Sequence, residues 1–120
     1  FLSGTRAEGW GLPFIEAAAC GLPIIATNYS SYKEFLEDDF LKVEYDLVVF
    51  DSDIRFVDLD ASPKWAEFRA NDMIKSLDLF FKNEKMYIDI ARRRKKIIKQ
   101  NYNSLHIIDN YKKFFESNCK

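Results

Sequence analysis

The sequence has few of the features that mark membrane proteins, metal-binding modules and disulfide-stabilised domains. It carries only two cysteines and one histidine, and its apolar runs are far shorter than the ~18 residues of a membrane-spanning helix. Cys20 and Cys119 stand at opposite ends of the chain without a metal-ligand spacing, so we expect reduced thiols in a cytoplasmic protein. The formal net charge of −1 gives no electrostatic reason to expect nucleic acid or an anionic membrane as a partner.

The sequence does have enough apolar material for a packed core. Hydrophobic residues make up 48% of the chain and aromatic residues 16%, which argues against disorder. At 120 residues there is room for one domain with one modest core. The chain opens on an apolar run, Phe1–Ser3, that leads directly into Gly4 without a methionine. We therefore expect a fragment, the C-terminal part of a longer polypeptide.

The first 27 residues have the pattern of a βαβ unit. Phe1–Ser3 is predicted to be a short buried strand, and Gly4–Trp10 a loop. A helix then runs from Gly11 to Cys20, since proline is favoured near a helix start, and Gly21 ends it. Pro23–Thr27 is a short apolar run typical of a buried parallel strand. This order predicts a parallel sheet with a right-handed crossover.

Between this unit and the C-terminal half the pattern is weaker. Ser31 and Glu34 have the spacing of a capping box, which predicts a short helix over Tyr32–Glu37. Strand-like runs follow at Val43–Phe50 and Ile54–Leu59, before a serine–proline break.

The last half of the sequence is predicted to be helical. Apolar residues recur there at helical spacing in three groups, each defining one apolar face. The groups are Met73, Leu77, Phe80 and Phe81; Met86, Ile90, Ile97 and Ile98; and Ile107, Ile108, Tyr111, Phe114 and Phe115. Asn103 or Ser104 can cap the third helix. We expect an α/β fold with a short parallel sheet and a helical C-terminal half, divided into a βαβ portion (1–61) and C-terminal helices (62–120).

The segment from Glu8 to Glu16 combines the features of a ligand site. Two glycines flank Trp10, so the backbone can bend sharply and a ligand can approach it closely. The N-terminus of the following helix offers free N–H groups and a positive dipole end, an anion site that fits a diphosphate. Open α/β sheets bind ligands at this carboxyl end of a strand. Glu16, at an unusual place to bury a charge, tilts back toward the loop and can accept two hydrogen bonds from a ribose diol.

The glutamates Glu8 and Glu16 enclose seven residues that include Gly9-Trp10-Gly11-Leu12-Pro13. After Glu16 the chain continues Ala17-Ala18-Ala19-Cys20-Gly21-Leu22-Pro23-Ile24-Ile25-Ala26. This pattern resembles glycosyltransferase family 4. Several Gly, Pro and Glu positions at fixed spacing make it far more specific than a lone Gly-x-Gly. The close resemblance covers Ser3 to Glu34.

The resemblance implies a nucleotide-diphospho-sugar site in the Rossmann-like C-terminal domain of a GT-B enzyme. Glu16 would hold the ribose hydroxyls of the nucleotide. Glu8 would be the catalytic residue, acting beside the donor sugar by transition-state stabilisation or sugar positioning. The backbone that lines the sugar would come from Gly9, Trp10 and Gly11, and the amides near Leu12 would approach the phosphates.

The resemblance further implies a retaining hexosyltransferase that needs no metal and no cofactor besides its donor. The domain that binds the acceptor (a sugar, a lipid or a protein glycan) and the basic residues that clamp the diphosphate lie upstream of this motif in the family. The chain alone is therefore expected to be inactive, because the acceptor is not oriented against the donor. In relatives the last helix crosses back to the N-terminal domain, so Phe114 and Phe115 are expected to be exposed. Ser31-Tyr32 stand where many relatives have Gly-Pro, which leaves the shape of that loop open.

Other motifs invite different interpretations. Asp51-Ser52-Asp53 has the Asp-x-Asp pattern of metal–diphosphate sites, but we expect a solvated turn. Arg92–Lys96 is predicted to be a solvated helix surface. The alternative is a basic patch that binds an anionic membrane, with the protein peripheral to it, or a lipid-linked acceptor. His106 is expected at a helix cap or on the surface, Cys20 packed between helix and strand, and Trp65 in the core.

Three functions fit the sequence. The parent protein transfers sugar, the segment binds a nucleotide or nucleotide sugar without turnover, or the fold persists as an interaction domain without the ligand. Intact Glu8, Glu16 and the glycines between them argue against the third. A GT-B nucleotide-sugar epimerase stays an alternative, and UDP, GDP and ADP sugars stay open as donors.

Overall fold

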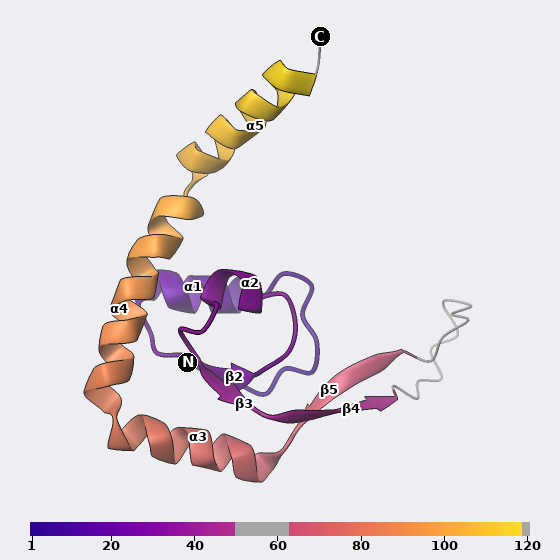
Figure 1. Cartoon of the computed structure of the whole chain (residues 1–120), viewed down its shortest axis with the longest axis vertical. Helices are drawn as coiled ribbons and strands as arrows, with labels where there is room; N and C mark the ends of the chain where they lie inside the picture. Colours follow the sequence, from indigo (N-terminus) through magenta and orange to yellow (C-terminus); the bar gives the residue numbers. More distant parts are fainter. Residues whose placement is uncertain (50–62, 119–120) are drawn as a thin grey trace.

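The computed structural model describes residues 1–49 and 63–118 and confirms an α/β fold with a helical C-terminal half (Figure 1). Its N-terminal portion contains β1 (Leu2–Ser3), α1 (Leu12–Cys20), β2 (Ile25–Thr27), α2 (Lys33–Leu36) and β3 (Leu41–Val43). A hairpin of β4 (Tyr45–Val49) and β5 (Lys64–Phe68) follows, and then α3 (Ala70–Lys82), α4 (Glu84–Asn101) and α5 (Ser104–Asn118). No helix in these two ranges is long and apolar enough to cross a membrane.

The sheet is parallel, with its strands in the order β1-β2-β3. Leu2 pairs with Ile25, which in turn pairs with Leu41 on the other side. The predicted βαβ unit is therefore confirmed. All residues of β2 are buried because the strand has a neighbour on each side and helices over both faces. The strand predicted at Val43–Phe50 corresponds to the end of β3 followed by β4.

Helices cover the two faces of this sheet in different numbers (Figure 1). On one face, Ile24 and Ala26 pack with residues of α1 and α2 and with Ile98 of α4. On the other face, Ile25 packs with residues of β3 and with Met73 of α3. Successive side chains of a strand point to opposite faces, so one short apolar run contributes to both cores.

Glycine and proline set the ends of α1 as predicted. Gly11 precedes the helix with φ 84, and Gly21 follows it with φ 79, both in the left-handed region that favours glycine. The N–H of Gly21 donates to the carbonyl of Ala18 at 2.9 Å. Pro13 is the second residue of the helix, where its missing N–H costs no helical hydrogen bond.

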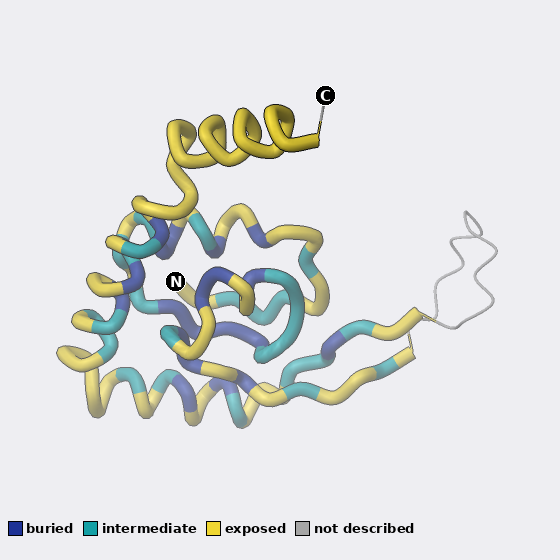
Figure 2. Tube along the Cα trace, turned by 45° about the horizontal axis from the view of Figure 1, so that its top comes forward, coloured by how far each residue is buried: buried dark blue, intermediate teal, exposed yellow. Residues whose placement is uncertain are grey.

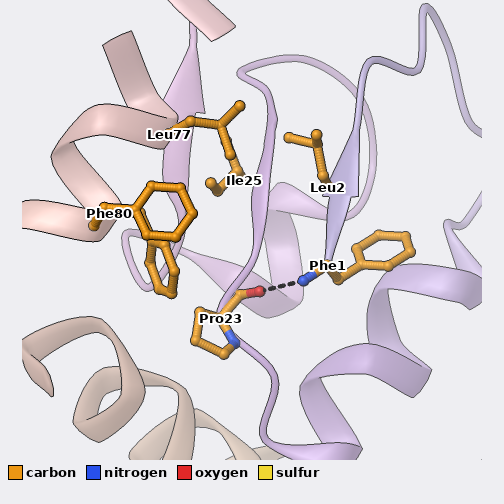
Figure 3. Close-up of a pocket in the computed structure, with 7 residues that line it drawn as sticks. Phe1, Leu2, Pro23, Ile25, Leu77 and Phe80 are labelled. Atoms are coloured by element: carbon orange, nitrogen blue, oxygen red, sulfur yellow. Dashed lines mark hydrogen bonds between the residues drawn. The ribbon is translucent and has the colours of Figure 1, made fainter. Parts of the chain in front are cut away.

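The first strand is exposed, so the prediction of a buried strand at Phe1–Ser3 was wrong. Leu2 is 50% exposed because β1 lies at the edge of the sheet. A shallow apolar pocket of about 160 Å³ opens along this edge, with Leu2 and Phe1 on one side, Ile25 in the floor, and Leu77 and Phe80 of α3 opposite (Figure 3). The amino group of Phe1 donates to the carbonyl of Pro23 at 2.7 Å.

The hairpin was missed, because β5 lies where helix was predicted from residue 62 onward. It pairs antiparallel with β4, Tyr45 opposite Phe68, and buries Ala66. β5 has only five residues, two of them the charged Lys64 and Glu67, so its sequence gives little indication of a strand. Its conformation depends on pairing with β4. The strand predicted at Ile54–Leu59 and the motif Asp51-Ser52-Asp53 lie outside the described residues.

The predicted C-terminal helices are confirmed, but their apolar faces are buried only in part. Ile98 is in the core, whereas Phe81 and Met86, which belong to the predicted apolar faces, are exposed. α5 buries no residue at all and is exposed along its whole length (Figure 2). Phe114 is 59% exposed and Phe115 is 55% exposed, as expected.

The start of α5 follows one of the two predicted alternatives. The side-chain Oδ1 of Asn103 accepts from the N–H of His106 at 2.9 Å, which caps the helix. His106 is exposed at this cap, as predicted. Around α2, by contrast, the predicted capping box was wrong: no side-chain hydrogen bond caps this helix, and the Ser31 hydroxyl instead faces the carbonyl of Glu8.

Two predictions on single side chains were also wrong. Arg94, predicted to be solvated with its basic neighbours, is only 5% exposed and is paired with Asp39 and Glu37. Cys20, predicted to be packed, is exposed at the end of α1, where its carbonyl accepts from Lys95 at 3.4 Å. Arg94 differs from its basic neighbours because its side of α4 packs against the segment that carries Glu37 and Asp39.

Candidate donor site

The loop from Gly4 to Trp10 connects the carboxyl end of β1 to the N-terminus of α1. Glu8 is partly buried in this loop, and its carboxylate Oε1 lies 3.2 Å from the hydroxyl of Thr5. The same hydroxyl lies 3.1 Å from the carbonyl of Ala7, so its single proton serves one acceptor at a time. Among the described residues no other hydrogen-bond donor to the Glu8 carboxylate is found.

The backbone of Glu8 is held by the loop that follows β2. The hydroxyl of Ser30 accepts from the N–H of Glu8 at 2.8 Å and donates to its carbonyl at 2.7 Å. The hydroxyl of Ser31 lies 3.4 Å from the same carbonyl. Two hydroxyl groups of this loop therefore face the backbone of the predicted catalytic residue, and one of them, that of Ser31, lies at the departure from the Gly-Pro pattern.

On its other side the loop is attached to β5. The N–H of Ala66 donates to the carbonyl of Arg6 at 3.0 Å, and Arg6 forms an ion pair with Glu67 at 2.7 Å. The Arg6 guanidinium also stacks over the ring of Trp65, 4.5 Å from its centroid. Trp65 is half-buried in this contact rather than at the centre of a core. The unpredicted hairpin is therefore one of the supports of the Glu8 loop.

Gly11 is required where the loop enters α1. Its φ is positive, and a Cβ at this position would lie 3.1 Å from the Cβ of Tyr32 and 3.3 Å from the ring of Phe14. At Gly9, by contrast, an added Cβ would meet nothing within 4 Å. Gly11 thus serves the fold, whereas the open space at Gly9 leaves its backbone accessible to a ligand.

The N-terminus of α1 offers fewer free amides than an average helix. Pro13 has no N–H, and the N–H groups of Phe14 and Ile15 both point to the carbonyl of Gly11, at 3.0 and 3.3 Å. Within the described part of the chain no backbone acceptor is found for the N–H of Leu12. The predicted anion site therefore depends mainly on Leu12, together with the loop residues before it.

The remaining predicted site residues lie on exposed surface. Leu12 and Glu16 are both exposed and share one face of α1, four residues apart, opposite the buried Phe14 and Ala18. Glu16 is thus not a buried charge. Trp10 is 44% exposed, and its indole packs toward Phe35 and Tyr102, with ring centroids 5.8 and 6.4 Å away.

Tyr32 anchors the loop that carries the serines. Its ring stacks on Phe14 with centroids 3.9 Å apart, and its hydroxyl donates to the carbonyl of Thr27. Burial raises the pKa of Tyr32 above its ordinary value of 10.0. A backbone hydrogen bond from Tyr29 lowers this pKa, and the negative charge of Glu8 raises it. Tyr32 is therefore a neutral structural donor near neutral pH and not an acid–base group.

No group of three or more His, Cys, Asp or Glu in residues 1–49 and 63–118 is placed to hold a metal ion. The apolar pocket at the β1 edge and a second one of about 420 Å³ on α5, lined by Ile107, Asn110, Tyr111 and Phe114, contain none of the predicted site residues. The candidate site is therefore an open surface around the Glu8 loop and the start of α1.

Residues 1–52 match the family model of glycosyl transferases group 1. The match includes the Glu8 loop, α1, the Ser30–Ser31 loop and β4, which supports a glycosyltransferase-related module in this segment. No curated protein and no solved structure gave a significant match.

The group 1 glycosyltransferase match contains every predicted site residue, but it ends before β5 and the C-terminal helices. Sequence reasoning missed Thr5 and Ser30 as contacts of Glu8, and Arg6 as the attachment to β5. Loop hydroxyls carry no periodic signal, and only the parallel pairing of β1 with β2 places the ends of these two strands side by side.

Proposed function

We propose that the full-length protein is a retaining glycosyltransferase of the GT-B fold, a hexosyltransferase, and that this chain is its donor-binding portion. The position of Glu8 supports this most directly. It lies inside the family-matched segment, at the carboxyl end of β1, with its peptide held by Ser30. Among the described residues only Thr5 contacts its carboxylate through a hydrogen bond.

In this proposal a nucleotide-diphospho-sugar lies across the loop and the start of α1. Its ribose hydroxyls donate to the carboxylate of Glu16, and a phosphate accepts from the N–H of Leu12. The sugar lies against the backbone of Gly9, where the structure leaves open space. The exposure of Leu12 and Glu16 on one face of α1 is consistent with a ligand on that face.

Glu8 acts on the sugar in this arrangement. Breaking the bond between the anomeric carbon and the phosphate creates positive charge on the sugar ring, and a fixed carboxylate stabilises that charge without reorganisation. No metal is required, because basic residues of the upstream part neutralise the diphosphate. The acceptor hydroxyl, on a sugar, a lipid or a protein glycan, is presented by another domain in the cytoplasm.

A binding module without turnover is the second candidate. The observation in its favour is that most of the predicted site residues lie on open surface around one loop and one helix start, which would let this chain bind a donor but not orient an acceptor against it. A nucleotide-sugar epimerase would use the same surface. Product analysis separates these functions, since transfer yields a glycosylated acceptor, epimerisation a changed sugar, and binding neither.

The donor assignment is tested by calorimetric titration of UDP, GDP and ADP sugars into the full-length protein. We expect one of them to bind, and Glu16→Ala to weaken it about 10- to 100-fold, since hydrogen bonds to a charged group contribute about 1.5–3 kcal/mol. Glu84→Ala, an exposed glutamate at the start of α4, is the control and leaves the affinity unchanged. Equal affinity of Glu16→Ala and wild type would show that the ribose assignment is wrong.

The catalytic assignment is tested with the donor so identified. Glu8→Gln keeps the size of the side chain and removes its charge, so we expect kcat to fall while nucleotide affinity stays near wild type. The isolated 120-residue chain should not transfer sugar. Transfer by the isolated chain, or full activity of Glu8→Gln, would contradict the proposed division of roles.

A further inference from the structure

Ser30 adopts a backbone conformation that serine rarely takes. Its φ is 91, and Glu37 is the other non-glycine residue with positive φ in the described ranges. A glycine would adopt this conformation without steric cost, but serine has a Cβ that crowds the backbone there. A strained residue in a loop next to a candidate site indicates that its side chain has a use.

The side chain of Ser30 does what glycine cannot. Its hydroxyl accepts from the N–H of Glu8 at 2.8 Å and donates to the carbonyl of Glu8 at 2.7 Å. One hydroxyl has one proton and lone pairs to spare, so both hydrogen bonds form at once. Together they fix the two backbone groups of one residue, and with them the direction in which the Glu8 side chain leaves the loop.

We propose that Ser30 is a positioning residue for Glu8 in the transfer reaction, a role that rests on the proposed function. Ser30 does not touch the donor; it orients the carboxylate that does. Ser30 contacts the backbone of Glu8, whereas Thr5, 3.2 Å from Oε1, contacts its side chain. Without the Ser30 hydroxyl, the backbone of Glu8 would keep only the longer 3.4 Å contact from Ser31 on the β2 side of the site.

The loop that carries Ser30 is held independently of the hydroxyl. Tyr32, two residues on, is fully buried, stacks on Phe14 and donates to the carbonyl of Thr27. The N–H of Glu34 donates to the carbonyl of Ser31 at 3.0 Å. Removal of the Ser30 hydroxyl should therefore leave the loop in place and release Glu8 alone.

Two substitutions separate positioning from stability. Ser30→Gly removes the hydroxyl and also relieves the positive φ, so we expect stability equal to wild type or higher; Ser30→Ala removes the hydroxyl alone. In both, kcat should fall on the order of 10- to 100-fold, because small misplacements of a reacting group have effects of this size. Nucleotide affinity should stay within about 2-fold, since Glu8 acts on the sugar. Ser31→Ala, which removes the longer 3.4 Å contact, is the matched control with a small effect.

A double-mutant cycle in the full-length protein tests whether Ser30 acts through Glu8. Ser30→Ala should lower kcat in the wild-type background and have no further effect in Glu8→Gln. Hydrogen exchange gives a second readout: the amide of Glu8 should lose protection in Ser30→Ala and keep it in Ser31→Ala.

The outcomes are distinct for the two proposals. If Glu8→Gln lowers transfer while Ser30→Gly and Ser30→Ala do not, the role of Ser30 is overturned and the proposed function stands. Equal losses from Ser30→Ala in both backgrounds would also overturn it, because Ser30 would then act independently of Glu8. If no nucleotide sugar binds the protein, the proposed function fails and the role of Ser30 in transfer fails with it.

Discussion

The Arg94 guanidinium of α4 donates from Nε to the Oδ2 of Asp39 at 2.8 Å, and both side chains are buried. The same guanidinium donates to Glu37 at 2.9 Å and to the carbonyl of Phe35 at 3.3 Å. These contacts hold the end of α2, whose start carries Tyr32 and the serine loop. α4 thus stabilises, through α2, the side of the site that contacts Glu8.

Arg94→Ala should destabilise the fold strongly. Removing one partner of a buried ion pair usually costs about 3–5 kcal/mol because the other charge is left uncompensated. We expect about 2–3 kcal/mol here, since Arg93 still contacts Asp39. Urea denaturation measures the change. Arg92→Ala, an exposed neighbour, is the control and should stay within about 0.5 kcal/mol; equal effects of the two would contradict the buried role of Arg94.

The same cluster predicts a loss of stability in acid. The hydrogen bond from Arg94 and its charge hold the pKa of Glu37 below its ordinary value of 4.5. The folded state then binds fewer protons than the unfolded state, so this contribution is present above about pH 4.5 and is lost as pH falls through the lowered pKa. Glu37→Gln should show a smaller decrease in urea midpoint between about pH 7 and about pH 3. If Glu37→Gln loses as much as wild type, this carboxylate is not a source of the acid sensitivity.

Gly11 and Gly9 make a matched pair for the loop. Gly11→Ala places a Cβ 3.1 Å from that of Tyr32 at positive φ, so we expect about 1–3 kcal/mol of destabilisation. Gly9→Ala meets open space and should leave thermal stability within about 0.5 kcal/mol of wild type while weakening binding of the donor sugar. The measurement is urea denaturation together with donor titration. Similar stability effects at the two positions would contradict the structure of the loop.

Tyr32→Phe should remove one buried hydrogen bond without changing the ring stack. The Thr27 carbonyl is then left without this donor, at a cost of about 1–3 kcal/mol. Because burial raises the pKa of Tyr32 above 10.0, its stabilising contribution is present below about pH 10 and is lost as pH rises further, so the variant should also show less alkaline destabilisation. Tyr29→Phe is the control and should have a small effect, because its hydroxyl donates no hydrogen bond to any of the described residues.

Much of the N-terminal half could be predicted because local rules agree there. Gly11 and Gly21 bound α1, the apolar run after Pro23 forms β2, and the Glu8–Glu16 segment lies in the part that matches group 1 glycosyltransferases. Each of these signals is carried by residues close together in sequence. The roles of Glu8 and Glu16 in donor binding stay predictions.

The misses share one physical cause. β5 forms by pairing with β4, Arg94 is buried because its side of α4 faces Asp39, and Phe1 and Leu2 are exposed because β1 ends the sheet. In each case the conformation or burial of the residue depends on whether a segment distant in sequence packs against it. Hydrophobic patterns and secondary-structure propensities describe single segments, so they do not predict contacts between distant segments.

The amino-acid sequence by itself determined the βαβ unit, the ends of α1 and the segment that carries the candidate donor site, because glycine, proline and apolar spacing act within a few residues. Only the tertiary structure decided what surrounds Glu8. The parallel pairing of β1 with β2 brings the ends of the two strands together, so that the Ser30 hydroxyl contacts the backbone of Glu8 although the two residues are 22 positions apart in the sequence. Hydrogen bonds of this kind depend on distances that folding sets and that no local pattern encodes.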